Sequence, residues 1–154
     1  MILSGQTIRN IGILTPFHER KVHELTGMSF GLSCAGYDIR LDNDVFLKSH
    51  GFELGVSMEY FDMPPNVLAR VADKSTLARQ GISVFNTIIE PGWKGYLTIE
   101  IANLSSEVKQ LVHGQPIAQI IFQFTDNPVE RLYTGKYQNA EKKPQPALRE
   151  LPVR

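Results

Sequence analysis

Hydrophobic and polar residues alternate over several short stretches of the chain, and such alternation is typical of β-strands that bury one face. The clearest stretch is 96–102, in which Leu97, Ile99 and Ile101 fall on one face and Glu100 on the other. Further strands are predicted at 37–41, at 67–71, at 82–89 with a break at Asn86-Thr87, at 108–112 and at 116–124, and as short strands joined at Gly51 and Gly55 within 44–60.

A short helix is predicted near the beginning of the chain, over residues 3–11. Ser4 suits the N-cap position, and Ile8 and Ile11 give a brief apolar stripe. Residues 12–33 are interrupted by proline and glycine, so no element is assigned to them. Short strands at close spacing, with glycine and proline turns and little helix, predict an all-β barrel or sandwich.

The length and composition of the chain predict one domain, residues 1–154. Hydrophobic residues make up 42% of the sequence, which is enough for an ordinary core. From about residue 125 to 154 the sequence becomes polar and contains many prolines, lysines and glutamines. This C-terminal tail is expected to build little core and to be mobile or folded onto something else.

The charge of the chain argues against nucleic-acid binding. Lys and Arg total 16, as do Asp and Glu, whereas a protein that neutralises a nucleic-acid backbone needs a basic surface. A single nucleotide stays open as a ligand because a pocket needs only a few cations. The one cysteine, Cys34, allows no disulfide within the chain, and no stretch approaches the ~18 apolar residues of a membrane span. A soluble, cytoplasmic protein is therefore expected, and the zero net charge is compatible with an oligomer.

Three residues near the N-terminus, His18, His23 and Glu24, raise the question of a metal site. Zinc-dependent deaminases need a His-x-Glu motif followed by Pro-Cys-x-x-Cys, and the chain has neither part. No metal ligand is therefore assigned to the protein.

Cations, hydroxyl groups and small residues gather in the segment 73–81. Ser75 and Thr76 add hydroxyl donors to the exposed N–H groups of a turn, and Lys74 and Arg79 add positive charge. Such groups together bind phosphate oxygens. The same residues also suit a capped helical turn, and the two interpretations are compatible because helix N-termini attract anions.

Several carboxylates have two open interpretations each. Glu100 is either an ordinary surface group or, if its face lines a pocket, a general base whose pKa burial raises. Glu90, before the turn at Pro91-Gly92, either organises that loop or accepts a ribose hydroxyl. Asp38 and Arg40 are expected to be solvated or ion-paired on a strand face.

Five motifs stand in a recognisable order along the chain: Ala35-Gly36-Tyr37-Asp38-Ile39-Arg40-Leu41; Lys74-Ser75-Thr76-Leu77-Ala78-Arg79-Gln80-Gly81; Glu90-Pro91-Gly92-Trp93-Lys94-Gly95 with Thr98-Ile99-Glu100; Gly114 with Ala118-Gln119-Ile120-Ile121-Phe122; and Gly135-Lys136-Tyr137-Gln138-Asn139. Together they resemble the dCTP deaminase branch of the dUTPase superfamily over most of the chain. The Arg that follows Ala in the second motif is typical of the deaminase form.

The resemblance implies a distorted jelly-roll or β-barrel of the dUTPase-like type, assembled as a homotrimer with active sites between subunits. The implied substrate is dCTP, which carries Mg²⁺ on its phosphates, and no zinc is needed. The implied reaction is attack of water on C4 of cytosine with loss of ammonia, and Glu100 is the implied general base. The C-terminal tail would exclude water by closing over the site.

The resemblance also assigns the residues that hold the substrate. The triphosphate is assigned to Lys74, Ser75, Thr76, Arg79 and Lys136. The sugar and base are assigned to Glu90, Thr87, Thr98, Tyr133 and Gln138.

Departures from the family pattern bear on the substrate. The segment 84–90 borders the expected pyrimidine site and is shorter than in the family, which predicts an altered base choice that admits cytosine substituted at C5. Glu90 stands where Asp is usual, and Ala140 where the deaminases often have Gln. Two alternatives stay open: a dUTP pyrophosphatase, alone or combined with deamination, and a non-catalytic nucleotide-binding protein of the same fold.

Overall fold

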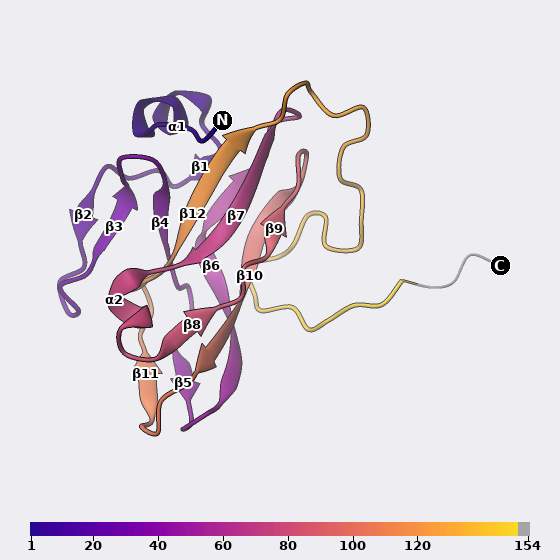
Figure 1. Ribbon diagram of the computed structural model, residues 1–154. Coiled ribbons are helices and arrows are strands. Elements are labelled where there is room, and N and C mark those ends of the chain that lie inside the picture. Colours follow the sequence, from indigo (N-terminus) through magenta and orange to yellow (C-terminus); the bar gives the residue numbers. More distant parts are fainter. Residues whose placement is uncertain (151–154) are drawn as a thin grey trace.

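The computed structural model describes residues 1–150, which form mainly β-strands with two short helices (Figure 1). In chain order the elements are α1 (Gly5–Ile11), β1 (Leu14–Thr15), β2 (Lys21–Val22), β3 (Ser29–Leu32), β4 (Tyr37–Arg40), β5 (Val45–Leu47), β6 (Phe52–Asp62), β7 (Val67–Asp73), α2 (Ser75–Ala78), β8 (Ile82–Val84), β9 (Ile88–Ile89), β10 (Lys94–Asn103), β11 (Lys109–Leu111) and β12 (Pro116–Phe124). Neither helix has the length and apolar character needed to cross a bilayer. The prediction of a mainly β fold with a short N-terminal helix is confirmed.

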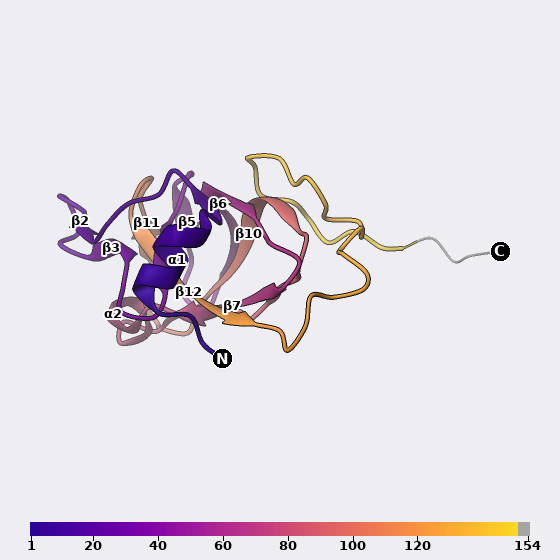
Figure 2. The same cartoon turned by 90° about the horizontal axis from the view of Figure 1, so that it is seen from above.

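The strands form two larger antiparallel sheets and one small pair. The four-stranded sheet has the order β1-β6-β10-β8, the six-stranded sheet has the order β2-β3-β4-β12-β7-β9, and β11 pairs with β5. Seen from above, the sheets curl around a shared interior (Figure 2). The apolar face predicted for 96–102 fills part of that interior, since Ile99 and Ile101 are buried.

Two local predictions differ from the structure. Gly55 does not join two short strands but lies inside the long strand β6. A Cβ at Gly55 would stand 2.6 Å from Cδ2 of Leu41, so the glycine allows a close approach of the neighbouring side chain. Ser4 precedes α1 as expected, but its hydroxyl bonds the Thr7 hydroxyl at 3.1 Å and makes no cap bond to a backbone N–H.

A buried ion pair joins the two larger sheets. Arg40 of β4 donates from Nε to Glu59 of β6 at 2.8 Å, and its backbone N–H donates to the other carboxylate oxygen at 2.9 Å. The Glu59 side chain is fully buried, and the Arg40 side chain is 12% exposed and packs over the Phe30 ring. Asp38 and Arg40 are thus both ion-paired, one of the two outcomes expected for this strand face.

The C-terminal tail, described as far as residue 150, lies against β10. Ala140 forms a parallel bridge with Gly95, and its carbonyl accepts a hydrogen bond from the Tyr96 N–H at 3.0 Å. A Cβ at Gly95 would stand 2.6 Å from the Ala140 backbone N, so this position needs glycine. Ala140 is part of the hydrophobic core, so the tail, which was expected to build little core, contributes to it at this position.

The Arg40–Glu59 pair yields a stability prediction. Glu59→Leu should lower the free energy of unfolding by about 3–5 kcal/mol, because it leaves a guanidinium buried without its carboxylate. Adding Arg40→Met should recover most of the loss, because replacing both buried charges by apolar groups is often nearly neutral. Urea denaturation at neutral pH measures both effects.

The exposed Arg9–Glu19 pair offers a matched control. The substitutions Arg9→Met and Glu19→Leu should change the free energy of unfolding little, singly or together. A double variant at positions 40 and 59 that is as unstable as Glu59→Leu alone would contradict the prediction.

Candidate active site

A cavity of about 400 Å³ lies over the polar face of β10, between β6, the β8–β9 connection and the C-terminal tail. Five predicted site residues line it: Thr87, Glu90, Thr98, Glu100 and Tyr133. The structure therefore brings together most of the residues assigned to the sugar and base, along with the assigned general base.

Glu100 stands in the middle of β10, directly opposite Leu54 of β6. Its backbone carbonyl accepts a hydrogen bond from the Phe85 N–H at 3.1 Å, which fixes the strand on its other side. The carboxyl is half-buried, and burial raises the pKa of Glu100. Within residues 1–150 no Lys, Arg or His nitrogen lies within 4.0 Å of it to counter that effect. A carboxyl of raised proton affinity in a cavity has the properties of an acid–base catalyst.

The C-terminal tail forms one side of the cavity and is held there by hydrogen bonds to Thr98 and Trp93. The Thr98 hydroxyl, two residues before Glu100, accepts a hydrogen bond from the Gln145 N–H at 3.0 Å. Trp93 Nε1 donates to the carbonyl of Tyr137 at 2.8 Å. Gln145 and Tyr137 themselves line the cavity, so the tail forms part of its wall.

Gln138 bonds the backbone of its own chain. Its Nε2 donates to the carbonyls of Gly92 at 2.8 Å and Tyr133 at 3.0 Å, and its Oε1 accepts from the Lys94 N–H at 2.8 Å. It lines neither of the two cavities described here. The structure thus shows Gln138 holding the tail to the turn before β10, and its direct contact with sugar or base stays a prediction.

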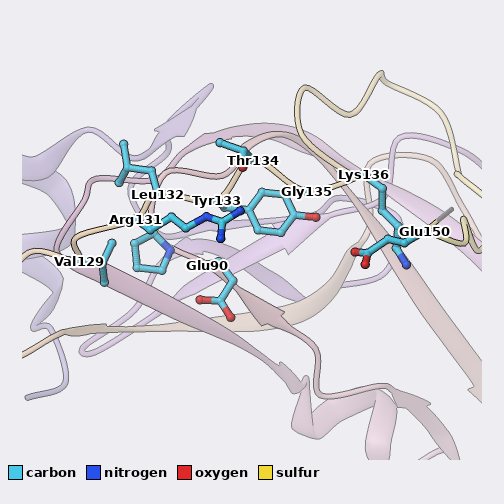
Figure 3. A pocket seen from close by; sticks show the side chains of 10 residues that line it. Glu90, Val129, Arg131, Leu132, Tyr133, Thr134, Gly135, Lys136 and Glu150 are labelled. Carbon is cyan, nitrogen blue, oxygen red and sulfur yellow. The ribbon is translucent and has the colours of Figure 1, made fainter. Parts of the chain in front are cut away.

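A second cavity, of about 630 Å³, lies beside the first and shares Glu90 and Tyr133 with it. Figure 3 shows its lining, in which Arg131 and Lys136 supply the positive side chains. Lys136, assigned to the triphosphate, therefore lies in a cavity that adjoins that of Glu100.

The remaining residues assigned to phosphate lie elsewhere on this chain. Ser75, Thr76 and Arg79 are exposed on or next to α2, and none of them lines either cavity. Lys74 is nearly buried, and its Nζ donates to Asp38 Oδ2 at 2.9 Å. The ammonium already has a carboxylate partner, so a direct role of Lys74 at phosphate stays a prediction.

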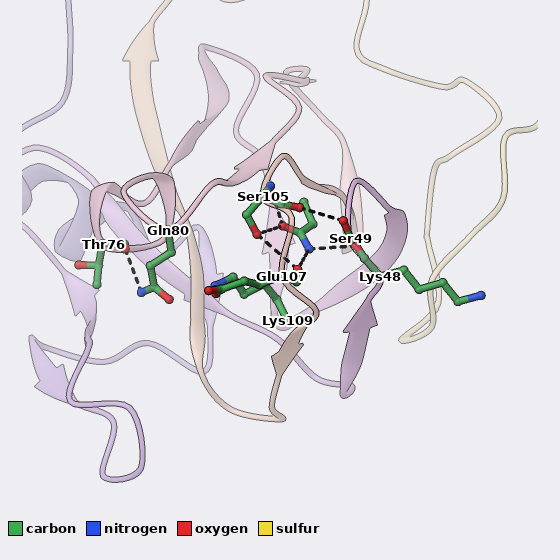
Figure 4. Close-up of polar contacts among 8 residues, drawn as sticks. Lys48, Ser49, Thr76, Gln80, Ser105, Glu107 and Lys109 are labelled. Carbon is green, nitrogen blue, oxygen red and sulfur yellow. Dashed lines mark hydrogen bonds and ion pairs between the residues drawn. The ribbon is translucent and has the colours of Figure 1, made fainter.

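A polar network at the end of β10 lies beside α2 (Figure 4), and no sequence pattern predicted it. The Asn103 amide donates to the carbonyls of Lys48 at 2.9 Å and Glu107 at 2.7 Å, and its oxygen accepts from the Ser105 hydroxyl at 2.7 Å. The Leu104 N–H then donates to the carbonyl of Gly81, just beyond α2, at 2.7 Å. These bonds connect the end of β10 to the turn that follows α2.

The sequence patterns also did not predict the aromatic and aliphatic side chains that line the Glu100 cavity. Phe52 and Leu54 come from β6, and Tyr96 comes from β10. Alternation identifies the faces of a single strand, but only the register between β6 and β10 places the first two beside Glu100.

The described residues offer no preformed metal site. Among residues 1–150 no group of three or more His, Cys, Asp or Glu side chains is arranged to hold an ion. His23 Nδ1 is instead hydrogen-bonded to the Thr26 hydroxyl at 3.0 Å.

The chain is similar in sequence to known nucleotide deaminases. The family model described as dCTP deaminase-like matches residues 37–125. The dCTP deaminase of Acidobacterium capsulatum is 34% identical over 162 aligned residues, which cover 84% of this chain and 88% of that relative.

Solved structures extend the likeness to the fold. The 2'-deoxycytidine 5'-triphosphate deaminase of Agrobacterium tumefaciens matches with a TM-score of 0.64 and 18% identity, over 80% of this chain and 48% of that one. A mutant dUTPase from phage phi11 of S. aureus, whose structure concerns coordination of a structural Mg(II) ion, matches with a TM-score of 0.56 and 16% identity, over 77% of this chain and 91% of that one. These likenesses confirm the predicted dUTPase-like β architecture.

The burial of Glu100 predicts a pH-dependent cost in stability. Because its pKa is raised in the folded state, the carboxyl costs nothing when protonated, and stability is lost as the pH rises through the folded pKa. Glu100→Gln removes the charge, so the variant should be more stable than the wild type at neutral pH. This advantage should vanish below the pKa of the unfolded carboxyl.

Urea denaturation at neutral pH and at about pH 4 measures this difference. Glu53→Gln, at an exposed position on β6, is the control and should shift stability little at either pH. A Glu100→Gln variant less stable than the wild type at neutral pH would refute the argument.

Proposed function

The chain belongs to the dCTP deaminase family of hydrolytic nucleotide deaminases, and on that premise we propose that it converts dCTP, or a dCTP substituted at C5, into the corresponding deoxyuridine nucleotide and ammonia. The observation that carries the proposal is the half-buried Glu100 carboxyl with its raised pKa, in a cavity next to Glu90 and Tyr133. A soluble, cytoplasmic location is part of the same proposal.

Glu100 would handle both protons of the attacking water. It first takes one proton as the water oxygen bonds to C4 of cytosine, and it delivers that proton to N3. It then takes the proton of the new C4 hydroxyl and delivers it to the exocyclic nitrogen. The C4–N bond breaks, ammonia leaves, and the C4 carbonyl of uracil forms. A carboxyl whose pKa is raised toward neutrality suits this task because it must both accept and release each proton.

The remaining assigned residues would orient the nucleotide. Glu90, which lines both cavities, would accept a hydrogen bond from the 3'-hydroxyl of the sugar. The side chains of Thr87, Thr98 and Tyr133 would contact sugar and base within the Glu100 cavity. Lys136, in the adjoining cavity, would then meet the phosphates.

The triphosphate would bring Mg²⁺ with it. The chemistry of the described residues fits an ion held by phosphate oxygens and water, because Mg²⁺ sites of this kind need at most one or two protein carboxylates. When bound, the ion would neutralise phosphate charge near Lys136. The deamination itself is proposed to need no zinc.

We further propose a homotrimer whose active sites lie between subunits. Within one chain, Ser75, Thr76 and Arg79 are exposed and line neither cavity beside Glu100. In the trimer, α2 of a neighbouring copy would place its Ser75, Thr76 and Arg79 at the Glu100 cavity and so complete the phosphate site. Such an arrangement explains why residues assigned to one ligand lie apart in one chain.

Product analysis tests the reaction. Purified protein with Mg²⁺ should release ammonia from dCTP or from a C5-substituted dCTP, with phenanthroline, a zinc chelator, leaving the rate unchanged. Glu100→Gln should retain nucleotide binding and lower kcat by about 10²–10⁴-fold, because it keeps the shape of the side chain but removes the base.

The same assay separates the alternatives. Release of pyrophosphate from dUTP would establish a pyrophosphatase, alone or beside deamination. Tight binding without any product would establish a non-catalytic nucleotide-binding protein. Either result without ammonia release would contradict the deaminase proposal.

Mixing two inactive variants tests the composite site. Arg79→Ala and Glu100→Gln should each be nearly inactive alone, but random exchange of subunits should restore roughly a quarter of the sites, in which both residues are intact. Ammonia release after unfolding and refolding the mixture measures this recovery, and native mass spectrometry measures the oligomer.

The double variant Arg79→Ala/Glu100→Gln mixed with Glu100→Gln is the matched control, since no arrangement of these chains contains an intact Glu100. Recovery absent from the main mixture, with mixed oligomers present, would show that the two residues do not act across subunits.

A further inference from the structure

An apolar wall stands beside Glu100 on the β6 side. Leu54 lies directly opposite Glu100 across the antiparallel pair, and Phe52 lies opposite Ala102. Side chains alternate along a strand, so Phe52 and Leu54 share the face that carries Glu100. Both residues line the cavity.

The Phe52 ring is held in place although half of its surface is exposed. It stacks on the ring of Phe85, with centroids 5.7 Å apart and planes 24° apart. Phe85 is in turn tied to the Glu100 carbonyl by its backbone N–H. The stack therefore joins β6 to the segment after β8, across β10.

The segment 87–90 lines the cavity on the opposite side of β10, with two polar and two apolar side chains, Thr87, Glu90, Ile88 and Ile89. The sheet order β6-β10-β8 places β6 and β8 on opposite sides of Glu100. Thr87, which follows β8, lines the cavity on that second side. The β6 side of the carboxyl thus offers the cavity no hydrogen-bonding side chain, whereas the second side offers the Thr87 hydroxyl.

This asymmetry orients a cytosine ring. The carbon attacked, C4, has N3 on one side and C5 on the other. N3 and the nearby O2 need hydrogen-bond partners, and the Leu54 and Phe52 side chains have none to offer. The C5–C6 edge carries only C–H groups, so it is the edge that fits this wall without leaving polar atoms unpaired.

We propose that Leu54 and Phe52 are specificity-determining residues that face the C5–C6 edge of the pyrimidine and set the size of the C5 substituent. The inference rests on the proposed function. The half-exposed Phe52 ring leaves the wall open toward solvent, so a substituent at C5 has a path out of the cavity. Such a wall also favours an apolar substituent over a hydroxylated one of similar size, because it cannot bond the hydroxyl.

The test measures ratios of affinity in the Glu100→Gln background, where nucleotides bind without turnover. Calorimetry gives the Kd of dCTP, 5-methyl-dCTP and 5-propynyl-dCTP for each variant. Leu54→Phe should weaken 5-methyl-dCTP relative to dCTP by about 10-fold, since it fills the space of the substituent. Phe52→Ala should strengthen 5-propynyl-dCTP relative to dCTP, because it widens the end of the cavity.

Phe46→Ala is the matched control, because Phe46 is also an exposed phenylalanine but lies on β5 and outside the cavity. Its ratios should equal those of the background protein. A ratio of two ligands on one protein sample is independent of the fraction folded. Equal changes for all ligands, or no change, in Leu54→Phe and Phe52→Ala would overturn the inference.

Ammonia release by the otherwise unmodified protein is measured in parallel. Its absence would overturn the proposed deamination, and the affinity ratios would still decide whether Leu54 and Phe52 face the substituent. No binding of any cytosine nucleotide would overturn both.

Discussion

The Arg40–Glu59 ion pair is the contact on which the placement of the site depends, because it joins β4 of one sheet to β6 of the other. Strand β6 carries the residues opposite Glu100, and β4 carries Asp38, which holds Lys74 just before α2. A shift of one sheet over the other would therefore move Leu54 and Phe52, on the strand paired with Glu100, relative to α2. A buried charge pair suits this role because its geometry is specific, whereas apolar packing tolerates sliding.

The attachment of the C-terminal tail to β10 is the second contact on which the site depends. Ala140 packs against Gly95 at the start of β10, where no side chain other than hydrogen fits. Before Ala140, Tyr133 lines both cavities, and after it Gln145 bonds the Thr98 hydroxyl. The tail therefore forms part of the wall of each cavity. The strand that carries Glu100 thus also positions the segment that forms part of its cavity wall.

Local pattern predicted much of this architecture but not its long-range register. Alternation placed Glu100 on the polar face of β10, and the turn at Asn86-Thr87 does separate β8 from β9. Gly55 was wrongly predicted to join two strands, because the sequence alone does not distinguish a glycine that allows a close side-chain contact from one that makes a turn. Leu54 could not be placed beside Glu100 from the sequence, because their contact depends on pairing between strands more than thirty residues apart.

The Asp38–Lys74 pair has a consequence for how this sequence can vary. The two residues are 36 positions apart in the chain and almost fully buried, and β12 separates β4, which carries Asp38, from β7, which ends just before Lys74. Loss of either alone leaves a charge inside the protein without its counterion, whereas loss of both does not. Substitutions at the two positions should therefore be inherited together, so that related chains keep the aspartate with the lysine or replace both.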